Sequence, residues 1–189
     1  IYVVGADGDA LNEVSDGPWS YDPTWAPGGD RVAYASTRAG VKRHSIYVSD
    51  VRRGGEQQLT VPGTVAYHPS WRPSGNRIAY VQITDGVSDM HVMDDQGRHL
   101  AQLTDDGDWE SRPSWHPRGT RIAFSSGGED EGHGDIYTMN ADGSDRRRLT
   151  AHAASDMDPI WSPDGRYILF TSTRDARRPE DGGICLSWA

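Results

Sequence analysis

Trp161-Ser-Pro-Asp-Gly-Arg-Tyr-Ile-Leu-Phe170 joins a tryptophan, a tight turn and the start of a strand, and the chain contains this unit four times. The other copies are Trp25-Ala-Pro-Gly-Gly-Asp-Arg-Val-Ala-Tyr34, Trp71-Arg-Pro-Ser-Gly-Asn-Arg-Ile-Ala-Tyr80 and Trp115-His-Pro-Arg-Gly-Thr-Arg-Ile-Ala-Phe124. Successive tryptophans lie 46, 44 and 46 residues apart. A period of this length, filled by several short strands, is typical of a β-propeller, in which each small sheet buries itself by stacking on its neighbours. We therefore predict an all-β fold, a β-propeller of four-stranded antiparallel blades.

Each repeat divides into four strands. In the last copy, a first strand over 158–162 leads into the turn Ser162-Pro-Asp-Gly165, whose residues favour the dihedral angles of a tight turn. The second strand, 167–172, is almost continuously apolar, as expected for a sheet that is covered on both faces. In the preceding copy the third strand, 136–139, and the fourth, 147–150, are joined by a turn rich in Asn, Asp and Gly.

The repeat fills the chain, so we predict a single domain over 1–189. Its predicted parts are a half blade at 1–15, full blades at 16–60, 61–104 and 105–150, and an incomplete last blade at 151–189. This division gives seventeen strands, one more than a closed ring of four blades holds. Because unmatched strands are costly, we favour part of a larger propeller, or a ring completed by association into a homodimer, over a closed four-bladed ring.

The composition limits the classes of partner. Acidic side chains outnumber basic ones, 28 to 19, giving a formal charge of −9 and a pI near 5.1. Such a surface repels phosphate backbones, so nucleic acid is not expected as a partner. No stretch approaches the roughly 18 apolar residues of a membrane span, and a start at Ile1 suggests a processed or truncated chain. The only cysteine, Cys185, excludes an internal disulfide and is expected to be a small buried residue.

The repeat residues resemble a known family. Asp158-Pro-Ile-Trp-Ser-Pro-Asp-Gly165, followed by Ile168-Leu-Phe-Thr-Ser-Thr-Arg-Asp175, is similar to the repeat of TolB-type propellers, as are Asp135-Ile-Tyr-Thr-Met-Asn-Ala-Asp-Gly143 and Arg148-Leu-Thr150 in the preceding copy. The resemblance covers nearly the whole chain. It implies a propeller of the kind found in periplasmic TolB, in secreted or envelope-associated bacterial proteins, and as the non-catalytic lid domain of prolyl-oligopeptidase-like peptidases. Family members usually have six or more blades, whereas this chain shows about four.

Variation between the repeats is concentrated at the channel rim, formed where the fourth strand of one blade leads into the first strand of the next. The residue before the strand proline is Asp22, His68, Arg112 or Asp158 in the successive copies. Aromatic and charged residues precede it, and variable loops on a rigid scaffold are where ligand binding is expected. Trp19 and Trp109 are the leading ligand-contact candidates, with packing at the blade junctions as their alternative role. The full predicted ligand-binding set is Trp19, Tyr21, Asp22, Tyr67, His68, Trp109, Glu110, Arg112, Asp156 and Asp158.

Other charged segments have simpler explanations. The loop 127–135 contains three consecutive acids, a histidine and a further aspartate, which are metal-ligand types, but its spacing fits no closed metal motif. Asp156 and Asp158 are carboxylates of the kind that binds a cation at the channel mouth. The simpler expectation is that they cap turns through side-chain hydrogen bonds. The basic runs 146–148 and 177–178 are expected to be solvated. No metal and no cofactor is predicted.

No nucleophile elbow, zinc-peptidase motif or phosphate-binding loop occurs in the sequence. We therefore predict a non-catalytic binding or scaffold propeller, periplasmic or secreted, that recognises a protein or a glycan through the channel rim. Two alternatives remain open. The chain would be the propeller portion of a larger enzyme such as a prolyl-oligopeptidase-like peptidase, or a metal-assisted polysaccharide lyase or hydrolase using Asp22, His68 and Asp158.

Overall fold

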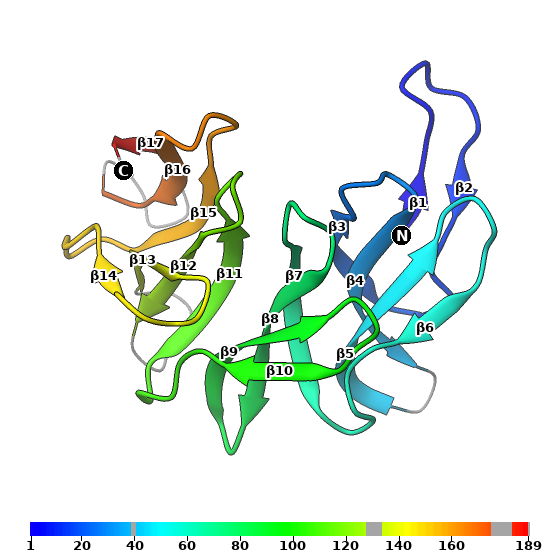
Figure 1. Ribbon diagram of the computed structural model, residues 1–189, viewed down its shortest axis with the longest axis horizontal. Coiled ribbons are helices and arrows are strands. Elements are labelled where there is room, and N and C mark those ends of the chain that lie inside the picture. The colour runs from blue at the N-terminus through cyan, green and yellow to red at the C-terminus, as the bar shows by residue number, and fades with distance from the viewer. Residues whose placement is uncertain (39–40, 128–133, 175–182, 189) are drawn as a thin grey trace.

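The computed structural model describes residues 1–38, 41–127, 134–174 and 183–188, with only the backbone described at 41–42 and 183–188 (Figure 1). Its regular structure is entirely β-strand across these residues, in one two-stranded hairpin and four larger antiparallel sheets. This confirms the predicted all-β propeller architecture. The acidic loop 128–133, the Arg177–Arg178 pair and the Cys185 side chain lie outside the described residues.

The four larger sheets are called blades 1 to 4. The N-terminal hairpin pairs β1 (Tyr2–Val3) with β2 (Asn12–Glu13). Blade 1 contains β3 (Ser20–Trp25), β4 (Arg31–Arg38), β5 (Val41–Asp50) and β6 (Glu56–Gln58). Blade 2 contains β7 (Val65–Trp71), β8 (Arg77–Thr84), β9 (Val87–Asp94) and β10 (His99–Gln102). Blade 3 contains β11 (Trp109–Trp115), β12 (Arg121–Gly127), β13 (Gly134–Asn140) and β14 (Arg147–Arg148). Blade 4 contains β15 (Asp156–Trp161), β16 (Tyr167–Ser172) and β17 (Gly183–Trp188).

The repeated residues have repeated structural roles. In blade 3 the turn after Trp115 closes with a hydrogen bond from Gly119 N–H to His116 O, 2.7 Å, and Gly119 has a φ of 67° that an L side chain adopts only with strain. The threonine that ends each four-stranded repeat accepts a hydrogen bond from a backbone N–H of the third strand, as in Thr150 Oγ1 and Ile136 N, 2.9 Å apart. The repeated Leu-Thr dipeptide therefore anchors the outer strand of each full blade.

Neighbouring blades are joined through the repeated tryptophan. Trp71 packs in a cluster with Ala33 of blade 1, and Trp115 Nε1 donates a hydrogen bond to Ser70 O of blade 2, 3.0 Å. The small alanines that face these rings, Ala33 and Ala79, are fully buried. Each tryptophan is thus held on the blade that precedes it in the chain.

The blades form an arc, with blade 1 and blade 4 at its two ends and β3, β7, β11 and β15 succeeding one another along its inner side (Figure 1). The N-terminal hairpin packs on blade 1 through Ile1 and Val3, against Tyr34 and Tyr47. It supplies only two short strands, and Trp25 remains 49% exposed. At the opposite end Leu169 of blade 4, which stands where other blades have a buried alanine, is 37% exposed. The arc therefore ends in two apolar faces that lack a full neighbouring blade among the described residues.

Candidate functional site

The first strand of every blade is interrupted at the same place. The register shifts between Tyr21 and Thr24 in blade 1, and at the matching positions in blades 2, 3 and 4. The residue inside each irregularity precedes a proline and has a left-handed backbone, with φ values of 53°, 50°, 54° and 55° for Asp22, His68, Arg112 and Asp158. Such irregularities turn a side chain away from the ladder. A left-handed conformation costs a non-glycine residue about 1–3 kcal/mol and is a feature of ligand-binding sites.

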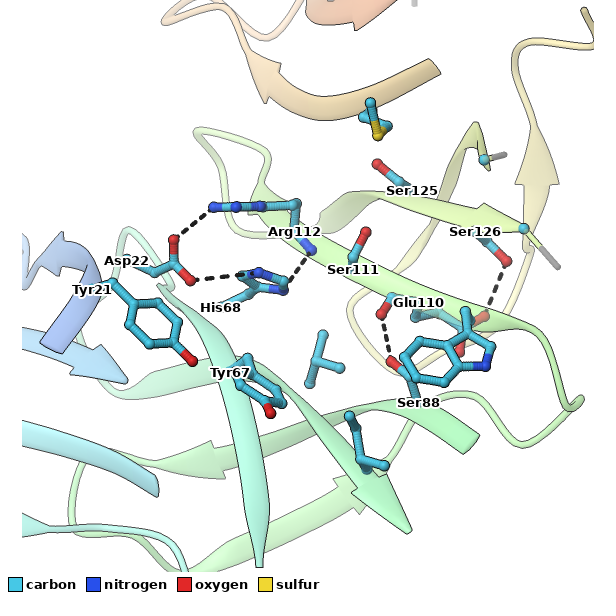
Figure 2. Close-up of a pocket in the computed structure, with 16 residues that line it drawn as sticks. Tyr21, Asp22, Tyr67, His68, Ser88, Glu110, Ser111, Arg112, Ser125 and Ser126 are labelled. Atoms are coloured by element: carbon cyan, nitrogen blue, oxygen red, sulfur yellow. Dashed lines mark hydrogen bonds and ion pairs between the residues drawn. The ribbon is translucent and has the colours of Figure 1, made fainter. Parts of the chain in front are cut away.

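These four residues, called the charge row, contact one another across three blade junctions. Arg112 Nη1 donates to Asp22 Oδ1 at 2.7 Å, and Arg112 Nε lies 3.1 Å from Asp158 Oδ1. The backbone N–H of Arg112 donates to His68 Nδ1 at 3.4 Å, and His68 Nε2 lies 3.5 Å from Asp22 Oδ2 (Figure 2). One guanidinium therefore links carboxylates from blades 1 and 4, and the blade 2 imidazole lies beside it.

Burial and the Arg112 charge lower the pKa of His68 to about 4, against the opposing influence of Asp22 and Asp158. Its imidazole is therefore neutral at neutral pH. Because His68 Nδ1 accepts a hydrogen bond, the proton of the neutral ring belongs on Nε2, which faces Asp22. The charge row then carries two negative charges and one positive charge.

The charge row separates two hollows on the inner side of the arc. The first is a cavity of about 440 Å³, whose wall includes Tyr21, Tyr67, Trp109 and Ser111 (Figure 2). The second is a hollow of about 410 Å³, lined by the prolines and small polar residues that follow the charge row. Asp22, His68 and Arg112 line both. These three side chains accordingly form the boundary between the two spaces.

Aromatic rings line the blade 1 and blade 2 side of the first cavity. Tyr21 and Tyr67 are stacked with centroids 6.3 Å apart, and His44 contacts both, at 4.9 Å and 5.1 Å. Trp109, which is half-buried, lines the same cavity from blade 3. Four serines also line it: Ser88, Ser111, Ser125 and Ser126. A space with aromatic walls and a few polar groups is the usual form of a ligand site.

Glu110 is the one carboxyl outside the charge row among the described residues that line the first cavity, and it is 1% exposed. Thr104 and Ser126 donate hydrogen bonds to its oxygens at 2.9 Å and 3.1 Å, and Arg146 Nη2 lies 3.3 Å away. Burial raises the pKa of Glu110 to about 7, although the hydrogen bonds and Arg146 oppose this shift. Its oxygens are bound by Thr104, at the end of the blade 2 repeat, and by Ser126 and Arg146 of blade 3, so Glu110 supports the cavity wall at this junction.

The comparisons with known proteins agree with this fold. The family model of the TolB beta propeller domain matches residues 1–129 and 113–179. The chain belongs to the TolB β-propeller domain family. A comparison with curated proteins gave no match.

Solved structures of TolB propellers superimpose on nearly the whole chain. TolB from Acinetobacter baumannii is 23% identical with a TM-score of 0.79, over 99% of this chain and 45% of that chain. A putative TolB from Agrobacterium tumefaciens is 25% identical with a TM-score of 0.83, over 99% of this chain and 69% of that one. An oligogalacturonate lyase in complex with manganese shares the fold at 16% identity and a TM-score of 0.72, over 99% of this chain and 55% of that chain. The chain thus spans between about half and two thirds of these proteins.

Within this TolB propeller, seven of the ten predicted ligand-binding residues line the first cavity: Tyr21, Asp22, Tyr67, His68, Trp109, Glu110 and Arg112. Asp158 lines the second hollow. Trp19 is 72% exposed and lines neither space, and Asp156 is fully buried with its carboxylate paired to Arg174. The structure therefore gathers most of the predicted set and separates these two residues from it.

Sequence reasoning missed several wall residues and one internal ion pair. Ser88 and Ser125 line the cavity from third and second strands, and His44 packs against Tyr21 and Tyr67. The repeat pattern gives no signal at these positions. The prediction that Arg146 is solvated is wrong: its side chain is 21% exposed, lies over the rings of Phe124 and Tyr137, and pairs with Glu110.

Metal-ligand types do not converge within the described residues, where no group of three or more His, Cys, Asp or Glu is placed to hold an ion. Between Asp22 and Asp158 lies the Arg112 guanidinium, in the place where a metal joining these carboxylates would sit. In the same part of the chain, no helix is long and apolar enough to cross a membrane.

Proposed function

We propose that this TolB-family propeller is a non-catalytic binding module that recognises an extended segment of a protein through the inner side of its arc. The proposal depends on one observation above all: four non-glycine residues at the same repeat position hold left-handed backbones and present their side chains to the same space. Strained backbones of this kind are typical of binding sites, where they fix the direction in which a side chain points. By similarity to the TolB structures, we propose the periplasm or the cell exterior as its compartment.

The chemistry of the cavity supports binding. Tyr21, Tyr67 and Trp109 supply flat surfaces with polar edges, which are favoured at protein interfaces because they contribute large contact area at low entropy cost. Asp22 and Asp158 each pair with Arg112, and His68 stays neutral at neutral pH. Charges that are paired with one another suit recognition. Glu110, whose pKa of about 7 lies in the range that proton transfer requires, has its oxygens bound by Thr104, Ser126 and Arg146.

Selection from a phage-displayed library of random linear peptides on the immobilised chain tests this proposal. Enriched peptides are then measured by fluorescence anisotropy with the wild type and with two matched variants, Trp109→Ala and Trp19→Ala. We expect Trp109→Ala to weaken binding roughly tenfold, as for an interface anchor, and Trp19→Ala to leave it unchanged. Failure to enrich any peptide, or equal binding by Trp109→Ala, would overturn the proposal. A glycan array in parallel detects the other ligand class.

A second candidate function is the propeller portion of a larger enzyme, and the exposed faces around Trp25 and Leu169 favour it because they resemble the buried junctions inside the arc. The relevant solved structures include a prolyl endopeptidase and an acylaminoacyl peptidase from Pyrococcus horikoshii, of which this chain covers 29% and 33%. A gene that continues beyond Ala189 into a Gly-x-Ser-x-Gly segment would support this candidate. For the lyase alternative, turnover of oligogalacturonate with added Mn²⁺ is the test, and we expect none.

A further inference from the structure

The inner side of the arc carries a net negative charge. Asp22 and Asp158 contribute two carboxylates against the single guanidinium of Arg112, and the imidazole of His68 is neutral at neutral pH. Glu110 is the remaining carboxyl of the first cavity within the described part of the chain, and Arg146 pairs with it from within blade 3. Among the described residues that line the two hollows, Arg112 is the only arginine, and its charge is shared by two acids.

One oxygen of the charge row keeps its capacity to accept a hydrogen bond. Asp22 Oδ1 receives the Arg112 guanidinium, whereas Asp22 Oδ2 is buried with no hydrogen-bond partner among the described residues. The nearest polar group facing it is His68 Nε2, at 3.5 Å. A buried carboxylate oxygen without a donor is costly, and a ligand that brings a charged donor removes this cost. Asp22 lines the first cavity, and because Oδ2 is itself enclosed, a donor in this cavity meets it once the Asp22 side chain rotates.

Aromatic rings lie beside this oxygen. Tyr21 is adjacent to Asp22 in the chain and stacks with Tyr67, and His44 contacts both rings (Figure 2). The faces of tyrosine and tryptophan attract cations through their quadrupoles, most strongly where water is excluded. Tyr21, Tyr67 and Trp109 therefore surround the cavity with groups that suit the same kind of ligand as the carboxylate does.

We propose that the first cavity selects a cationic side chain, a lysine or an arginine, from the protein segment that the propeller binds. The charged group reaches Asp22 Oδ2, and its aliphatic stem lies between the aromatic walls. This inference rests on the proposed function and adds the chemistry of the ligand. Arg112 does not exclude the cation, because the two carboxylates that it links leave the charge row negative.

Acetylated, amidated tetralysine and tetraglutamate are the probes. The chain is labelled with 5-fluorotryptophan, and the ¹⁹F resonance of Trp109 is assigned through Trp109→Phe. We expect tetralysine to shift this resonance with an affinity that falls as salt is added, and tetraglutamate to leave it in place. Equal responses to the two peptides, or a tetralysine response at every tryptophan except Trp109, would overturn the inference.

Three variants separate the site from the overall negative charge of the chain. Asp22→Asn should weaken tetralysine binding roughly two- to fivefold, the size expected for one partly exposed ion pair. Asp30→Asn removes the same charge from an exposed turn and should have no effect. Arg112→Gln should strengthen binding by a similar factor, a direction that loss of folding does not produce. Weakening by Asp30→Asn equal to that by Asp22→Asn would show non-specific attraction and overturn the inference.

Selection from the peptide library distinguishes this inference from the proposed function. Enriched peptides that contain Lys or Arg, and that lose affinity when this residue is replaced by Glu, support both. Enriched peptides that bind through acidic or apolar residues contradict the cation preference and leave the proposed function standing. An empty selection, with no response to tetralysine, contradicts both.

Discussion

Trp115 and Trp25 occupy the same place in the repeat, yet Trp115 is 6% exposed and Trp25 is 49% exposed. The turn after each of them forms the same hydrogen bond, from Gly119 N–H to His116 O and from Gly29 N–H to Ala26 O. The difference arises outside the repeat, because Trp115 packs on blade 2 whereas, among the described residues, Trp25 has only the short N-terminal hairpin beside its blade. The motif thus determines local structure, and the neighbouring blade determines burial, as in other repeat proteins.

The largest difference is expected between alanine variants of these two tryptophans. Trp115→Ala should lower the free energy of unfolding by about 3–5 kcal/mol, because it leaves a cavity at the junction of blades 2 and 3. Trp25→Ala should cost about 1 kcal/mol or less, since half of its surface is already in water. Urea denaturation followed by circular dichroism measures both. Equal costs would show that the two faces are buried alike in solution.

A second test concerns the polar part of the same interior junction, where Glu110 lies beside Ser88 of blade 2. The pKa of Glu110 is raised from 4.5 to about 7, so between these pH values the unfolded chain has lost a proton that the folded chain retains. This contribution to the free energy of unfolding therefore falls as pH rises through the window and stays reduced above it. Glu110→Gln should remove that loss. The free energy of unfolding of the variant relative to the wild type should therefore be about 2–3 kcal/mol higher at pH 8 than at pH 4.

The measurement is the difference in stability between Glu110→Gln and the wild type at each pH, because other groups titrate in the same range. The lowered pKa of His68, about 4, gives the opposite slope: stability falls as pH drops from 6.5 towards 4. Subtraction of the two curves cancels the His68 contribution. A difference that does not change with pH would show that Glu110 is not a buried acid at this junction.

A third test exchanges the residues that face the tryptophans. Ala123 is fully buried, so Ala123→Leu should overpack the junction of blades 3 and 4 and cost about 1–3 kcal/mol. Leu169 has the equivalent position in blade 4 and is 37% exposed. Leu169→Ala should therefore change stability by about 0.5–1 kcal/mol at most. Thermal unfolding of the two variants gives the ranking. A larger loss for Leu169→Ala would indicate that another surface covers blade 4 in solution.

Much of the fold could be predicted from the sequence, because the repeated turn, the apolar second strand and the closing threonine each have a local physical cause. The charge row was also found in the sequence, as the residues before the strand prolines. Its geometry was not, since the left-handed backbones of Asp22, His68 and Arg112 arise from strand irregularities that the sequence pattern does not reveal. The pairing of Arg112 with Asp22 crosses two blade junctions, and the curvature of the arc brings these side chains together.

The division of the chain into one domain, with a half blade at 1–15 and an incomplete last blade at 151–189, remains a prediction. A repeat specifies its own blade and not the presence of the next one, so the sequence pattern could not predict which surface, if any, covers the exposed faces at Trp25 and Leu169. Glu110 and Asp156 illustrate the same point within blades: both were predicted as ligand contacts, and both are buried against arginines of their own blade.

The central claim is that a ligand binds on the inner side of the arc and not on its exposed ends. ¹⁹F NMR of the 5-fluorotryptophan chain, titrated with a peptide from the library selection, tests it directly. We expect the Trp109 resonance to shift in proportion to occupancy while those of Trp25, Trp71 and Trp115 remain in place. A shift of Trp25 with Trp109 unchanged would contradict it, because the ligand would then cover the open face of blade 1.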